Sequence, residues 1–112
     1  MKWNELRSPD QLDEIREESK SSPVLIFKYS SRCSVSQLAL DRLERKWSDR
    51  AEAIKPYFLD LLAHREVSKR VADQFDVEHE SPQVLLIRNG SAVYDRSHFE
   101  IEFGEIVAAA GN

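Results

Sequence analysis

The chain has 112 residues, 41% of them hydrophobic and 32% charged, and this length suits one domain over residues 1–112. Its 16 basic and 20 acidic residues give a net charge of -4, which disfavours nucleic acid or an anionic membrane as partner, because both attract an excess of Lys and Arg. The apolar runs, such as VLIF, are far too short to span a bilayer, and we expect no signal peptide. A single cysteine suits a reducing compartment, so we expect a cytoplasmic protein.

The chain is predicted to begin with a short edge strand within residues 1–6, followed by a helix. In the stretch RSPDQLDEIREESK, Ser8 is the expected N-cap, Pro9 suits the first helical position and Gln11 completes a capping box. The SSP sequence at residues 21–23 ends this helix.

The run VLIFKYS, residues 24–30, is apolar and rich in β-formers, as in a strand covered on both faces. From Ser34 onward the apolar residues repeat with a helical period, so Cys33 lies where a strand changes to a helix. The predicted apolar row of that helix is Val35, Leu38, Ala39, Leu43 and Trp47.

The second half of the chain predicts further strands and helices, and the Asn89-Gly90 pair predicts a tight hairpin turn. The parallel connection between the first two long strands should be right-handed, and the hairpin should add two antiparallel strands to a mixed sheet covered by helices on both faces. In chain order the expected elements are a strand at 53–62, a helix at 64–77, strands at 81–88 and 91–96, and a helix at 100–110.

Cys33 is a candidate nucleophile because the first turn of a helix has free N–H groups and a partial positive charge that stabilise a thiolate. Arg32 and Lys28 could add positive charge, and Ser34 and Ser36 could donate hydrogen bonds. The alternative is an inert, buried cysteine, since free cysteine is often a small core residue.

Pro82, in the segment HESPQ, directly precedes a strand expected in the middle of the sheet. Proline is tolerated at the first residue of a strand, and a proline in such a connection can have a cis peptide bond. Because that strand is antiparallel to the one before Cys33, both residues should lie at the same edge of the sheet, where two loops form a groove.

The segments SRCSVS, HESPQV and SHFEI, in this order of elements, resemble the monothiol bacilliredoxins of the thioredoxin superfamily, over nearly the whole chain. The resemblance implies a thioredoxin-like α/β fold, with a mixed four- to five-stranded sheet flanked by helices. It also implies that Cys33 attacks a bacillithiol mixed disulfide on a client protein, and that Pro82 beside it is cis. This sequence has Ser34 where family members commonly have proline, and Arg32 where threonine is common.

Ser36 has no sulfur, so a mixed disulfide on Cys33 cannot be resolved within the chain and must wait for a second thiol. This favours removal of a low-molecular-weight thiol from client proteins over dithiol reduction of protein disulfides. The resemblance makes bacillithiol the co-substrate, with no bound cofactor. Arg32, Lys28 and the backbone of Ser81 and Gln83 are candidate partners for its carboxylates, the alternative for the two cations being ordinary solvated charge.

Two functions of other classes remain open. One is iron–sulfur cluster carriage, as in monothiol glutaredoxins, although Ser34-Val35 does not match the glycine and phenylalanine usual there. The other is a non-catalytic binding module with an inert Cys33. His64, His79 and His98 have no zinc-finger or Glu-x-x-His spacing, so we expect no metal site.

Overall fold

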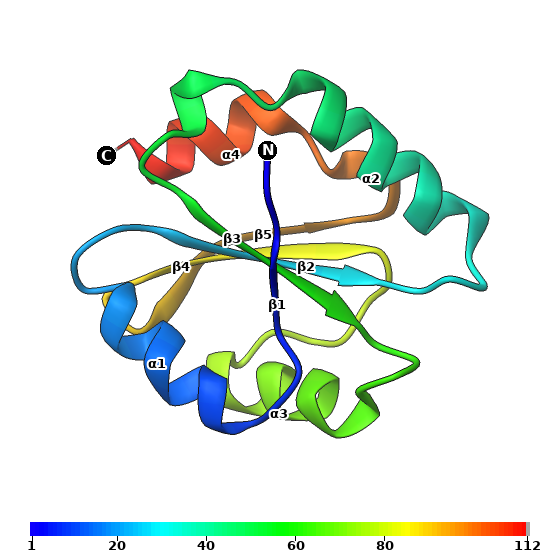
Figure 1. Cartoon of the computed structure of the whole chain (residues 1–112), viewed down its shortest axis with the longest axis horizontal. Helices are drawn as coiled ribbons and strands as arrows, with labels where there is room; N and C mark the ends of the chain where they lie inside the picture. Colours follow the sequence, from blue (N-terminus) through cyan, green and yellow to red (C-terminus); the bar gives the residue numbers. More distant parts are fainter. Residues whose placement is uncertain (112) are drawn as a thin grey trace.

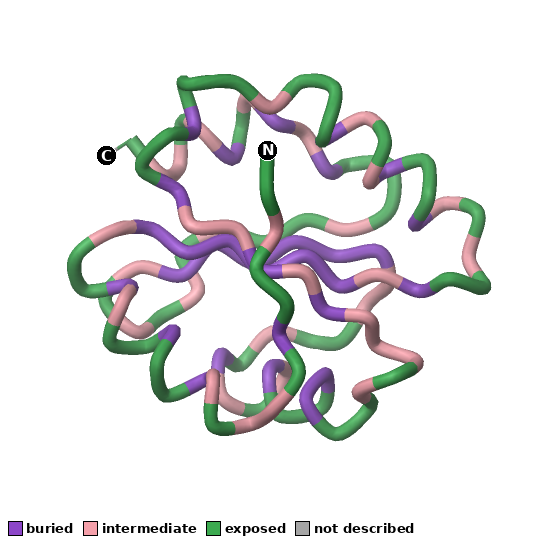
Figure 2. The backbone as a smooth tube through the Cα atoms, in the orientation of Figure 1, coloured by how far each residue is buried: buried purple, intermediate pink, exposed green. Residues whose placement is uncertain are grey.

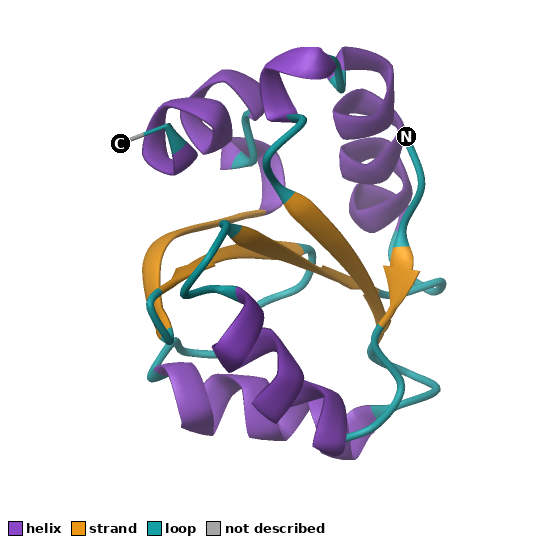
Figure 3. Ribbon diagram, turned by 60° about the vertical axis from the view of Figure 1, so that its left-hand side comes forward, coloured by secondary structure: helices purple, strands orange, loops and turns teal. Residues whose placement is uncertain are grey.

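A computed structural model describes residues 1–111 as a central sheet between two layers of helices (Figures 1 and 3). Its strands are β1 (Asn4–Glu5), β2 (Val24–Tyr29), β3 (Lys55–Asp60), β4 (Gln83–Arg88) and β5 (Ser91–Ser97). Its α-helices are α1 (Asp10–Glu18), α2 (Ser34–Lys46), α3 (Arg65–Phe75) and α4 (Phe103–Ala110), with 3-10 turns η1 (Asp49–Ala51) and η2 (His98–Glu100).

The five strands are ordered β1-β3-β2-β4-β5. Strand β3 is parallel to both β1 and β2, whereas β4 is antiparallel to β2 and to β5. The predicted mixed α/β architecture is therefore confirmed, including the short edge strand at the N-terminus. The Asn89-Gly90 turn is confirmed too, because both residues have positive φ angles, 52° and 78°, as a two-residue hairpin turn of this kind requires.

Each face of the sheet packs against its own pair of helices. Alternating residues of β2 divide between the faces, since Val24 and Ile26 join the core under α1 and α3, and Leu25 and Phe27 join the core under α2 and α4. Figure 2 shows the central strands as the most continuously buried part of the chain. This division matters for the site, because neighbouring residues of β2 point to opposite sides of the sheet.

Two local predictions about the helices need correction. The capping box of α1 is only half formed: Gln11 Oε1 accepts a hydrogen bond from the N–H of Ser8 at 3.0 Å, but Pro9, not Ser8, is the N-cap, the helix begins at Asp10, and no side chain caps it. On α2, Leu38 is 46% exposed, so it does not belong to the buried row that contains Ala39 and Leu43.

Both edges of the sheet are irregular. Strand β1 pairs only with Tyr57 and Phe58 of β3, and Pro56, which has no N–H, lies just before them. On the opposite edge, the pairing of β5 with β4 shifts register between Leu86 and Ile87.

Candidate active site

Three connections meet at one end of the sheet, on the right in Figure 1. Strand β2 leaves the sheet there and β4 enters it, because Lys28 near the end of β2 pairs with Gln83 at the start of β4. The connection between β2 and α2 contains Cys33, and the segment before β4 contains Pro82. The turn η2 that follows β5 packs against α2 at this same end. The sheet thus brings together segments about fifty residues apart, as the sequence predicted.

Cys33 is partly exposed and occupies the N-cap position of α2 in an extended conformation, with φ -112° and ψ 114°. Its own N–H donates to the carbonyl of Ser30 at 3.1 Å, which fixes the turn before the helix. The N–H of Ser36 is the main cause that lowers the pKa of the Cys33 thiol; burial opposes it, and the N–H of Val35 and the Ser36 hydroxyl lower the pKa further. The local geometry thus favours a thiolate.

The serines and the arginine around Cys33 occupy different environments. Ser36 has no exposed surface, and its hydroxyl accepts a hydrogen bond from the N–H of Ser30 at 3.2 Å. Ser34 is exposed as the first residue of α2, and Arg32 is exposed in the preceding turn. Ser36 therefore lies inside the loop that carries Cys33 and binds its backbone at Ser30. The side chains of Ser34 and Arg32 face the solvent.

The Ser81–Pro82 peptide bond is cis, as expected, and Pro82 is buried. Its carbonyl accepts a hydrogen bond from the N–H of His98 at 2.9 Å, and His98 Nε2 lies 3.8 Å from a carboxylate oxygen of Glu80. The Ser81 hydroxyl is buried without a hydrogen-bond partner among residues 1–111. His98, which follows β5, thus reaches the Pro82 segment.

Gln83 and Lys28 point away from α2, to the face covered by α1 and α3. The Gln83 side chain is 1% exposed and donates from Nε2 to the carbonyl of Glu78 at 2.9 Å. Neither prediction for Lys28 holds, since its side chain is 0% exposed: it is neither a solvated charge nor a cation within reach of a ligand beside Cys33. Its Nζ instead lies 3.2 Å from Nδ1 of His79, a pairing that sequence reasoning missed. The sequence did contain one sign of a buried partner for Lys28, because this lysine is a lone charge in an otherwise apolar strand.

No group of three or more His, Cys, Asp or Glu side chains within residues 1–111 is arranged to hold a metal ion. In the same part of the chain, none of the helices combines the length and the apolar character needed to cross a membrane.

Comparison with known proteins relates the chain to a redox family. The sequence matches the family described as monothiol bacilliredoxin BrxC over residues 4–106. A solved structure provisionally described as an oxidoreductase with a thioredoxin fold has 30% sequence identity and a TM-score of 0.79, with 94% of this chain and 90% of that chain covered. The fold expected from the sequence, thioredoxin-like α/β, is confirmed.

Thioredoxins themselves are more distant. The thioredoxin of Malassezia sympodialis has 14% identity and a TM-score of 0.75, over 98% of this chain and 89% of that one. The thioredoxin of Fasciola hepatica has 14% identity and a TM-score of 0.71, over 96% of both chains. At these identities the likeness concerns the fold alone.

Proposed function

Because this chain belongs to the monothiol bacilliredoxin family, we propose that it removes bacillithiol from client proteins through a mixed disulfide on Cys33. A role in thiol redox chemistry follows from the family and from the 30% identical relative with a thioredoxin fold. The observation that carries the finer proposal is the position of the one thiol, at the N-cap of α2 with two backbone N–H groups lowering its pKa.

The reaction consists of two thiol–disulfide exchanges. The Cys33 thiolate attacks the bacillithiol sulfur of a client mixed disulfide, the client sulfur leaves as a thiolate that takes up a proton, and bacillithiol remains on Cys33. A second thiol, free bacillithiol, then attacks the bacillithiol sulfur of this adduct. Bacillithiol disulfide forms and the Cys33 thiolate is regenerated, so the protein undergoes no net oxidation.

The other residues have supporting roles in this proposal. The N–H groups of Val35 and Ser36 and the Ser36 hydroxyl stabilise the thiolate, as the direction of the Cys33 pKa indicates. The exposed Arg32 is available to a carboxylate of the incoming thiol, Ser34 begins the helix, and Ser81 and Pro82 lie at the same end of the sheet as the Cys33 connection. Gln83 acts from the other face by holding the carbonyl of Glu78 in place. A reducing compartment such as the cytoplasm suits this chemistry.

The test is transfer of the small thiol, followed by intact mass. A client protein carrying bacillithiol is incubated with the wild type and with Cys33→Ser, and we expect only the wild type to gain the mass of one bacillithiol while the client loses it. Clients carrying glutathione or coenzyme A in place of bacillithiol identify which small thiol is preferred. A wild type that acquires no mixed disulfide from any of the three clients contradicts the proposal.

The same preparation separates the two alternative functions. A coloured, cluster-bearing protein after anaerobic purification would favour iron–sulfur carriage. A Cys33 pKa near that of free cysteine, with no adduct after treatment with diamide and bacillithiol, would favour a binding module.

A further inference from the structure

Lys28 is a completely buried cation on the face of the sheet opposite α2. Among residues 1–111 no carboxylate lies within 4.0 Å of its ammonium, and His79 Nδ1, at 3.2 Å, is its hydrogen-bond partner. Burial lowers the pKa of Lys28 to about 8. Burying a cation without an anion is costly, so the contact with His79 supplies the acceptor that this amine needs.

The Lys28–His79 contact depends on the protonation of both groups. A charged lysine can only donate, so Nδ1 of His79 must accept, and it can do so only while the imidazole is neutral. Burial, and then the charge of Lys28, lower the pKa of His79, while the nearby Glu80 carboxylate raises it. When both groups carry a proton, neither has a lone pair for the other and two positive charges face each other.

His79 belongs to the segment of residues 76–82, which connects α3 to β4 and ends in Ser81 and Pro82. The carbonyl of Glu78, one residue earlier, accepts the hydrogen bond from Gln83. Lys28 and Gln83 are register partners on neighbouring strands, so two adjacent side chains of one sheet face hold two consecutive residues of this segment. The fixed part of the segment therefore precedes Ser81 and Pro82, which lie at the same end of the sheet as the Cys33 connection.

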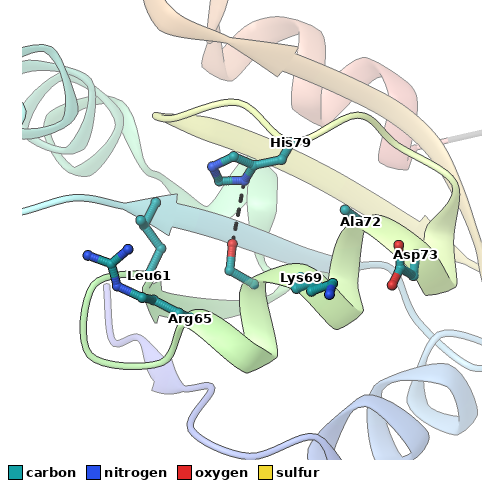
Figure 4. Close-up of a pocket in the computed structure, with 7 residues that line it drawn as sticks. Leu61, Arg65, Lys69, Ala72, Asp73 and His79 are labelled. Carbon is teal, nitrogen blue, oxygen red and sulfur yellow. Dashed lines mark hydrogen bonds between the residues drawn. The ribbon is translucent and has the colours of Figure 1, made fainter.

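The imidazole of His79 is open to solvent through a pocket of about 340 Å³. In Figure 4 the ring of His79 lies above α3, and a dashed line marks its hydrogen bond. The partner of Nδ1 in this contact is the hydroxyl of Ser68, at 3.5 Å. Protons can thus reach His79 without unfolding of the chain. The charged groups that face it are Arg65, Lys69 and Asp73 of α3, Glu80 of its own segment and Lys28 of β2.

We propose that Lys28 is a positioning residue that acts through His79 on the segment that ends in Pro82. While His79 is neutral, the pair holds residues 76–82 in the place that thiol exchange on Cys33 requires. When His79 takes up a proton, the pair separates and the segment loosens, so exchange slows at acidic pH for a reason other than protonation of the thiol. The part concerning exchange rests on the proposed function, whereas the part concerning the segment does not.

Three variants distinguish this role from general packing. Lys28→Met keeps the length and the apolar stem of the side chain but removes the amine. His79→Asn keeps an acceptor oxygen close to the place of Nδ1 and cannot be protonated near neutral pH. Lys69→Met is the matched control, because it removes an exposed lysine from the rim of the same pocket.

The first readout is hydrogen exchange of residues 76–82, expressed as protection factors so that the intrinsic pH dependence is removed. In the wild type and in Lys69→Met we expect protection to fall by about tenfold as His79 becomes protonated. Lys28→Met should have the low protection at every pH, and His79→Asn the high protection at every pH. Wild-type protection and pH dependence in Lys28→Met, or a persisting pH dependence in His79→Asn, would overturn the proposal.

The second and third readouts are the imidazole titration of His79, by NMR, and thiol transfer. Removing the neighbouring cation in Lys28→Met should raise the pKa of His79 and slow transfer by about tenfold, with the pKa of Cys33 unchanged. An unchanged His79 titration, or transfer at the wild-type rate, would refute the positioning role. If the wild type itself transfers no thiol, the proposed function fails, while hydrogen exchange and the titration still decide whether Lys28 holds the segment.

Discussion

The Ser36 hydroxyl, which has no exposed surface, accepts a hydrogen bond from the backbone N–H of Ser30 at 3.2 Å. Ser30 ends the extended segment before the Cys33 turn, and Ser36 lies in the first turn of α2. This serine therefore closes the connection that carries Cys33, in addition to lowering the pKa of its thiol.

Replacing Ser36 by alanine should weaken both effects. We expect Ser36→Ala to lose about 1 kcal/mol of unfolding free energy, because the buried N–H of Ser30 loses its acceptor. The pKa of Cys33 should rise but stay below that of free cysteine, because the N–H groups of Ser36 and Val35 remain. Urea denaturation and an ultraviolet titration of the thiolate measure the two effects. The exposed Ser34→Ala is the control, and equal values in both variants would contradict the assignment.

Replacing Ser36 by cysteine should change the course of the reaction. Positions 33 and 36 are three residues apart at a helix start, so a thiol at 36 faces the same side as Cys33. After treatment with bacillithiol disulfide, the wild type should retain one bacillithiol, whereas Ser36→Cys should release it and form an internal disulfide. Intact mass before and after reduction separates the two products. A stable adduct on Ser36→Cys would show that the second sulfur cannot reach the first.

Restoring proline at position 34 should stabilise the chain. Ser34 is the first residue of α2, where proline is favoured, and the extended conformation of Cys33 is the one that a residue before proline prefers. We expect Ser34→Pro to gain about 0.5–1 kcal/mol by restricting the unfolded chain. The Cys33 pKa should remain lowered, because the N–H groups that act on the sulfur belong to Val35 and Ser36. Urea denaturation and thiol titration test both statements; a loss of stability would mean that α2 does not begin at this residue.

A carboxylate far from Cys33 should control stability at acidic pH. Glu18 at the end of α1 accepts hydrogen bonds from Lys55 and from the Tyr57 hydroxyl. Burial alone would raise the pKa of Glu18, but these hydrogen bonds outweigh it and hold the pKa below its ordinary value of 4.5. Because the folded-state pKa is lowered, the stabilisation is present above the unfolded-state pKa and is lost as pH falls through the folded-state pKa.

We therefore expect Glu18→Gln to lose about 1 kcal/mol at neutral pH and to approach the wild type as the pH falls through the lowered pKa of Glu18. Urea midpoints across this pH range measure the difference. Glu14→Gln, at an exposed position of the same helix, should match the wild type throughout. A difference between Glu18→Gln and the wild type that does not change with pH would mean that packing, not charge, is lost.

The periodicity of apolar residues was enough to predict the order of the main elements, and strand direction predicted that the Cys33 and Pro82 segments lie at the same end of the sheet. Those features follow from local residue patterns and from the direction of each strand, and both can be inferred from the sequence. Leu38 was misplaced because helical spacing alone cannot say how wide the covered stripe of α2 is. Lys28 was misread because its partner, His79, is 51 residues away, and only the folded sheet brings the two together.

The irregular sheet edges bear on how copies of this chain behave at high concentration. An open strand edge is a template on which another chain can build β-structure and aggregate. At the β1 edge, only two residues of β3 pair with β1, and Pro56 has no N–H to donate. At the opposite edge, β5 has a shifted register and exposes the charged side chains of Asp95 and Arg96. Neither rim presents a long, flat row of donors and acceptors, so edge-to-edge fibril growth is disfavoured in the folded protein.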